Sequence, residues 1–140
     1  MDFNGKYRHS IDDKNRLAIP SKILETIDKE KEGNGFVITQ GFDDCLFLYT
    51  TRKWKEVESE LRKIDIKNEK DRHYQRVTIA SMVVIPECDQ QGRIVIPPEM
   101  KEFAKLEKKV VIIGILDRIE IWNEKLWEKY STGGKYKGNG

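Results

Sequence analysis

The stretch Asp12-Asp13-Lys14-Asn15-Arg16-Leu17-Ala18-Ile19-Pro20 occurs a second time as Asp89-Gln90-Gln91-Gly92-Arg93-Ile94-Val95-Ile96-Pro97. The Asp, Arg, Ile and Pro residues coincide at an offset of 77 residues. A second block, residues 36–54, lines up with residues 109–127 at an offset of 73. Two copies of one unit of this length cannot each bury a hydrophobic face alone, so they should pack together. The sequence therefore predicts an α+β fold with pseudo-twofold symmetry.

Each copy shows the same predicted order of elements. Residues 7–11 alternate as a half-buried strand, residues 12–15 have the composition of a turn, and residues 16–19 should complete a hairpin with the first strand. A short helix opens at Pro20, a second hairpin joins residues 36–39 to 45–49, and Thr50 or Thr51 caps a longer helix. In the second copy the strands are expected near 82–87, 93–96, 109–113 and 118–122, with Asn123 as the helix cap.

The two offsets differ by four residues, and this difference falls at residues 29–35, which we interpret as an enlarged polar loop. Residues 68–81 are expected to form a linking helix. The predicted organisation is thus a first repeat at 6–54, a helical linker at 55–80, a second repeat at 81–127 and a flexible tail at 131–140.

Composition narrows the class of protein. The 140 residues are 38% hydrophobic and 36% charged, enough for one compact core with a highly charged surface. Lys135 and Lys137 near the end of the chain account for the net charge of +2, so the overall charge does not indicate a polyanionic partner. The longest apolar run, residues 110–116, is far shorter than the ~20 residues of a membrane-spanning helix. We expect no membrane partner, and the absence of a leader-like apolar stretch predicts a cytoplasmic protein.

Several other groupings of reactive residues lack the spacing that their chemistry needs. The two histidines, His9 and His73, have no cysteine or carboxylate at metal-ligand spacing, and no glycine-rich phosphate loop occurs. Cys45 and Cys88 are too few for a disulfide framework and are expected to be reduced. We therefore expect no enzyme activity, no metal, no cofactor and no small-molecule substrate. The three tryptophans are interpreted as core or subunit-interface residues: Trp54, Trp122 and Trp127.

The repeated Asp-x-x-x-Arg motif has two possible interpretations. Asp12 with Arg16, and Asp89 with Arg93, can be ion pairs that do no more than secure a turn, since exposed pairs contribute little stability. Alternatively, the aspartates orient arginines that contact phosphates or guanine edges, to which the guanidinium fork is suited. The residues alone leave both interpretations open.

A resemblance favours the second interpretation. The two Asp-x-x-x-Arg segments, each followed by Ile-Pro, together with Gly114-x-x-Asp117-Arg118-Ile119-Glu120-Ile121-Trp122, resemble the MraZ family of bacterial transcriptional regulators. The similarity covers about residues 3 to 130. Asn15 stands where that family usually has glycine, a small departure because asparagine tolerates the left-handed conformation.

The resemblance implies two tandem SpoVT/AbrB-like domains with swapped-hairpin β-barrel topology. It also implies a homo-oligomeric ring of several subunits in the cytoplasm and nucleoid, which binds double-stranded DNA at direct repeats upstream of its own cell-division and cell-wall operon. Its DNA-contacting arginines correspond to Arg16 and Arg93. Around them we expect backbone contacts from Lys14, Lys6 and Arg8, with Asp12 and Asp89 as the arginine-orienting residues. Arg72 and Arg76 are further candidates for phosphate contact or an inter-subunit pair.

The rival function is an oligomeric protein-interaction module that sequesters a partner protein, in which the arginines would hold subunits together. Salt dependence separates the two, because DNA binding weakens steeply as salt is raised. The subunit number, the operator sequence, activation against repression, and DNA contact by one repeat or both are not determined by the sequence.

Overall fold

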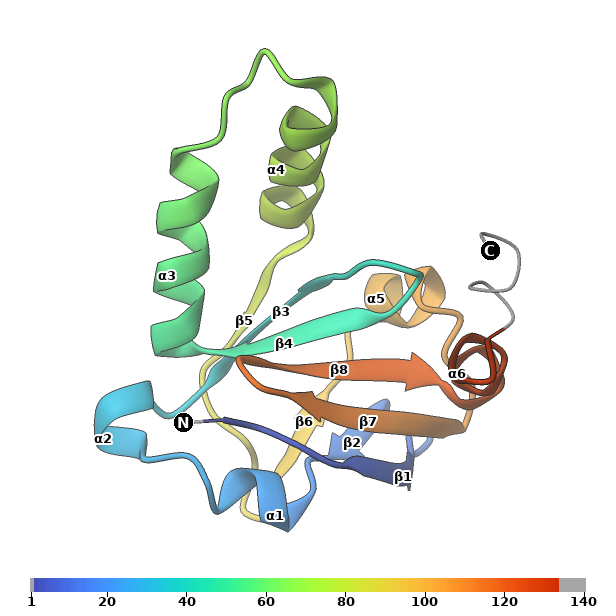
Figure 1. Cartoon of the computed structure of the whole chain (residues 1–140). Helices are drawn as coiled ribbons and strands as arrows, with labels where there is room; N and C mark the ends of the chain where they lie inside the picture. The colour runs from blue at the N-terminus through green and yellow to red at the C-terminus, as the bar shows by residue number, and fades with distance from the viewer. Residues whose placement is uncertain (1, 134–140) are drawn as a thin grey trace.

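The structure, a computed structural model, describes residues 2–133 and has the predicted α+β architecture (Figure 1). Its strands are β1 (Lys6–Ser10), β2 (Arg16–Ala18), β3 (Phe36–Gln40), β4 (Leu46–Thr50), β5 (Val83–Ile85), β6 (Arg93–Val95), β7 (Lys109–Ile115) and β8 (Arg118–Asn123). Its helices are α1 (Ser21–Leu24), α2 (Lys29–Glu32), α3 (Thr51–Arg62), α4 (Glu69–Ser81), α5 (Pro98–Phe103) and α6 (Glu124–Ser131).

A six-stranded antiparallel sheet forms the body of the molecule, in the order β1-β7-β8-β4-β3-β5. Exchanging each strand for its repeat counterpart (β1 for β5, β3 for β7, β4 for β8) gives the same order in reverse. The register is equally symmetric at the centre, where Leu46 pairs with Ile121 and Leu48 with Ile119. The two halves of the chain are therefore interleaved in one sheet about a pseudo-twofold axis.

The remaining strands, β2 and β6, pair with each other and form a separate two-stranded ribbon, and one isolated antiparallel bridge also joins Leu17 of β2 to Ile11. The hairpin predicted between residues 7–11 and 16–19 is limited to that bridge, whereas β1 pairs with β7, and β5 with β3, which the prediction did not include. The physical reason is burial: an isolated hairpin is marginally stable, whereas pairing β2 with β6 lets Leu17 and Ile94 enter one core at 0% and 2% exposure.

Two hydrophobic clusters cover the two faces of the large sheet. One cluster joins that sheet to the ribbon and to α1 and α5, and includes Leu17, Ile38, Ile94, Ile96 and Ile112. The other lies under the longer helices, with Trp54 and Trp122 buried and Trp127 partly buried. These tryptophans are core residues, as predicted. In Figure 1, α3 and α4 stand away from the sheet as a helical hairpin.

Helix caps follow the prediction more closely than the loops do. The side chains of Thr50 and Asn123 accept hydrogen bonds from the backbone N–H of Lys53 (3.2 Å) and Leu126 (3.1 Å). Residues 29–35 are not simply a polar loop, because they contain α2, whose Glu32 is 5% exposed. The predicted linking helix is α4, which a short segment separates from α3. Ser131, the first residue of the predicted flexible tail, belongs to α6, and residues 134–140 lie outside the described part of the chain.

Candidate functional site

The first Asp-x-x-x-Arg motif forms a turn held by one carboxylate. Asp12 Oδ1 accepts hydrogen bonds from the backbone N–H of Lys14 (2.9 Å) and of Arg16 (2.8 Å). Asp12 Oδ2 accepts a bond from Arg16 Nε (2.7 Å). Asn15 takes the left-handed conformation that closes the turn, with φ of 62°. A single aspartate thus fixes both the turn and the direction of the arginine side chain.

The second motif repeats this geometry atom for atom. Asp89 Oδ1 accepts from the N–H of Gln91 (2.9 Å) and Arg93 (2.9 Å), and Asp89 Oδ2 accepts from Arg93 Nε (2.7 Å). Gly92, with φ of 74°, occupies the left-handed position held by Asn15 in the first turn. The equivalence of the two turns is therefore a property of the fold as well as of the sequence.

These hydrogen bonds stabilise the ionised form of both carboxylates and lower their pKa values. The backbone N–H of Arg16 does most to hold the pKa of Asp12 below its usual value, and the Arg16 guanidinium adds to this effect. Arg93 lowers the pKa of Asp89 in the same way. Each arginine uses Nε for its bond to the aspartate, and we call this bond the aspartate clamp. Among residues 2–133 no hydrogen bond is made by the two terminal nitrogens of either arginine. Those nitrogens are oriented and available to an external acceptor.

The ribbon brings the two arginines onto one face. Arg16 pairs with Val95 and Ala18 with Arg93, and directly paired residues of an antiparallel ladder point to the same side. Leu17 and Ile94 alternate with them and face the core. Arg16 and Arg93 therefore occupy diagonal positions, which in an antiparallel pair lie about 7 to 8 Å apart.

The other predicted contact residues divide into two groups. Lys14 is exposed at the tip of the first turn, beside Arg16. Lys6 and Arg8 lie on β1, and a strand advances about 3.3 Å per residue, so Lys6 lies roughly 20 Å along the chain from the turn. Arg8 is also engaged elsewhere, since its Nη1 lies 3.2 Å from Glu124 Oε2 and 3.6 Å from Glu128 Oε1 on α6. The structure thus groups Lys14 with the arginines and separates Lys6 and Arg8 from them.

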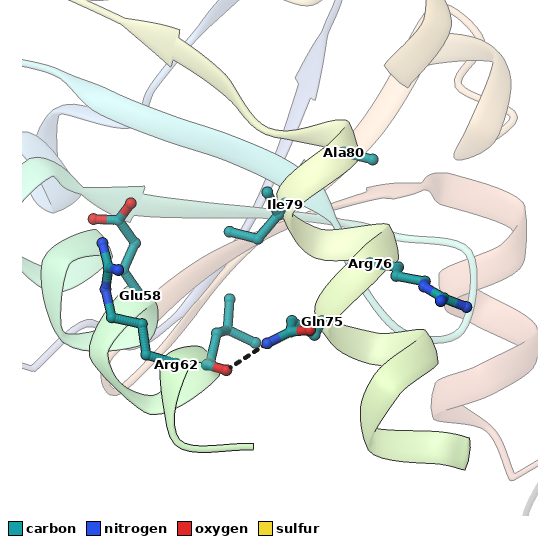
Figure 2. Close-up of a pocket in the computed structure, with 7 residues that line it drawn as sticks. Glu58, Arg62, Gln75, Arg76, Ile79 and Ala80 are labelled. Carbon is teal, nitrogen blue, oxygen red and sulfur yellow. Dashed lines mark hydrogen bonds between the residues drawn. The ribbon is translucent and has the colours of Figure 1, made fainter. Parts of the chain in front are cut away.

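A different hollow of about 620 Å³ lies between α3 and α4. Its floor is apolar, with Leu61 and the half-exposed Ile79, and Gln75 Nε2 donates a hydrogen bond to the Leu61 carbonyl (2.9 Å). Figure 2 shows Ile79 and Gln75 directed toward α3, whereas Arg76 points to the other side of α4. Arg72 Nη1 donates a hydrogen bond to the Ile66 carbonyl (2.9 Å). Neither arginine of α4 belongs to the ribbon face.

Comparison with known proteins shows the family of the chain. The MraZ family, described as "MraZ protein, putative antitoxin-like", matches residues 3–77 and 83–134. The chain belongs to the MraZ family. A relative from Thermoanaerobacter sp. (strain X514) is 42% identical over 128 residues, which is 91% of this chain and 85% of the relative. Relatives from Acetivibrio thermocellus (41% identical, 92% and 86% covered) and Clostridium botulinum strain Eklund 17B (38%, 92% and 87%) are similar, and all three are named transcriptional regulator MraZ.

In this member of the MraZ family the described residues include no group of three His, Cys, Asp or Glu side chains that could hold a metal ion. No helix within residues 2–133 is long and apolar enough to span a membrane. Cys45 and Cys88 are both free.

The sequence analysis missed two residues of the ribbon face, Ala18 and Val95. Val95 is 57% exposed although it is apolar. The alternation of Arg93, Ile94 and Val95 was the available signal, because it places Val95 on the same side as Arg93. The sequence contains no comparable signal for the pairing of β2 with β6, which places Val95 opposite Arg16.

Proposed function

We propose that this protein is a sequence-specific double-stranded DNA-binding transcriptional regulator whose β2/β6 ribbon enters the major groove. The observation that carries the proposal is the pair of aspartate-clamped arginines on one face of the ribbon, with 32% of the Arg16 side chain and 27% of the Arg93 side chain exposed. The major groove, about 12 Å wide, admits a two-stranded ribbon. A guanidinium that keeps two terminal nitrogens free can bond to guanine O6 and N7 together, the commonest specific contact to a base.

The contacts around the arginines follow from their placement. Lys14, at the turn tip, is positioned to meet a backbone phosphate beside the groove, which fixes register without reading sequence. Asp12 and Asp89 orient the arginines through the Nε bonds. Lys6 and Arg8 remain candidates only for DNA that continues past the ribbon along β1. For Arg8, contact with a phosphate requires release from Glu124 and Glu128.

The finer proposal follows the family resemblance. The chain would consist of tandem SpoVT/AbrB-like units with exchanged strands, act without enzymatic activity or cofactor, and work in the cytoplasm and nucleoid as a ring of several subunits. Its targets would be direct repeats upstream of its own operon. One ribbon offers few cationic contacts, so multiple ribbons on evenly spaced boxes would raise avidity by roughly 10² to 10⁴.

Gel-shift titration of the full chain on the duplex upstream of its own gene tests the proposal. Arg16→Ala and Arg93→Ala should each weaken binding strongly, because each removes a base contact whose aspartate partner stays charged. Lys55→Ala, which removes an exposed cation from α3, is the matched control and should bind as the wild type does. Light scattering verifies that the variants assemble normally. Wild-type affinity of both arginine variants would refute the assignment, and absence of any duplex binding at low salt would favour the protein-interaction alternative.

A further inference from the structure

The exposed face of the ribbon has an apolar component between its arginines. Its outward residues are Arg16, Ala18, Arg93 and Val95. Val95 lies directly across the ladder from Arg16 and two residues after Arg93 on the same strand, so it neighbours both guanidinium groups. Its side chain is 57% exposed, whereas the next residue, Ile96, is fully buried. A β-branched side chain with few rotamers is thus held rigidly where DNA is proposed to lie.

The major-groove edges of the bases offer one apolar feature, the 5-methyl group of thymine. We propose that Val95 is a specificity-determining residue that packs against the methyl group of a thymine next to the base read by Arg16. This inference rests on the proposed function, because it requires the ribbon to sit in the major groove. Arginine supplies hydrogen bonds to guanine, and the isopropyl group supplies the apolar contact that distinguishes thymine from cytosine at the adjacent position.

The contact also makes the two possible orientations of the ribbon on a DNA box unequal. The pseudo-twofold operation that exchanges Arg16 and Arg93 exchanges Val95 with Ala18, whose side chain is a single methyl group. Lys14 is likewise exchanged with Gln91. A ribbon with equal residues at these positions would bind a box equally well in both orientations. Unequal residues make one orientation preferable, which suits boxes repeated head to tail rather than inverted.

Deoxyuridine substitution tests the contact, because it removes the methyl group and leaves base pairing unchanged. The probe is a duplex selected by the wild-type chain from a random-sequence library, with each thymine replaced in turn. At one position the wild type should lose about fourfold in affinity, the value expected for one buried methyl group. Val95→Ala should bind the thymine and deoxyuridine duplexes equally. Ile66→Ala removes an apolar side chain that is 60% exposed between α3 and α4, away from the ribbon, and should keep the wild-type sensitivity.

The exchange variant Ala18→Val with Val95→Ala should move the sensitivity to a thymine beside the base read by Arg93. Both positions are at least partly exposed, so circular dichroism and light scattering should match the wild type. Wild-type binding that is insensitive to deoxyuridine at every position, or sensitivity that persists in Val95→Ala, would overturn the inference. If Arg16→Ala still loses binding in that case, the proposed function stands without it. Absence of any wild-type binding would overturn both.

Discussion

Replacing Lys14 by glutamine should reduce the salt dependence of DNA binding by a fixed amount. Only the backbone N–H of Lys14 takes part in its turn, where it donates to Asp12 Oδ1 (2.9 Å). Gln91 makes the same bond to Asp89 Oδ1 (2.9 Å) at the equivalent position, so a glutamine side chain is compatible with this turn. Lys14→Gln therefore removes one positive charge from the ribbon and leaves its geometry unchanged.

The magnitude follows from counterion release. Each phosphate neutralised contributes about 0.9 to the slope of log affinity against log salt concentration. On a short duplex that binds one subunit, the variant should lose about 0.9 from this slope. The factor by which the variant binds DNA more weakly than the wild type should then shrink by about 3.5-fold as salt rises from 50 to 200 mM.

Fluorescence anisotropy on a labelled duplex, repeated at four or more salt concentrations, measures the slope. Gln91→Lys should change the slope by a similar amount in the opposite sense. Lys55→Gln on α3 serves as the control for loss of a charge away from the ribbon. A Lys14→Gln slope identical to that of the wild type would show that Lys14 does not contact a phosphate.

Three further predictions concern stability. Leu17→Ala should lower the free energy of unfolding by about 2 to 5 kcal/mol, because the side chain is fully buried beneath the ribbon; the urea midpoint measures this, and an unchanged midpoint would contradict the burial. Thr50→Ala should lower the free energy of unfolding by more than the ~1 kcal/mol of a lost helix cap, because the Thr50 hydroxyl also donates a hydrogen bond to buried Glu32 (2.8 Å). Thr50→Ser keeps the hydroxyl and should retain most of the stability in the same urea titration. Because the folded pKa values of Asp12 and Asp89 are depressed, their contribution to stability is complete above the unfolded value of about 3.9 and is lost as the pH falls through the lower folded values. The Asp12→Asn, Asp89→Asn double variant should accordingly have a lower urea midpoint than the wild type at pH 6, and the two midpoints should converge at the acidic limit. A difference in midpoint that is independent of pH would contradict the stabilising role of the two ionised aspartates.

The ribbon contains both features that the sequence predicts and features that it does not. The Asp-x-x-x-Arg motifs predicted two equivalent turns with oriented arginines, and the turns have that geometry. The local hairpin expected from the same motif is limited to the bridge between Ile11 and Leu17, and β2 pairs with β6 instead. The hydrogen-bonding capacity of a strand does not specify its partner, and the choice depends on which pairing buries Leu17 and Ile94. That information lies in residues about 77 positions apart.

The grouping of the candidate site shows the same division. The sequence placed Lys6, Arg8 and Lys14 together because they are close along the chain. The structure separates them, since β1 carries the first two away from the ribbon and α6 supplies acidic partners for Arg8. Conversely, Val95 joins Arg16 only through the pairing of β2 with β6.

The sequence by itself determined the internal repeat, the two clamped turns, the helix cap at Asn123 and the choice of Thr50 or Thr51 for the other cap, which the structure places at Thr50. Each of these depends on hydrogen bonds or backbone conformations within a few residues, which the local composition specifies. Only the tertiary structure decided that strands of the two repeats interleave, that Arg16 and Arg93 share one partly exposed face of the ribbon, and that Val95 lies between them. These arrangements depend on burying side chains that are distant in sequence, and local interactions do not select among the possible long-range pairings.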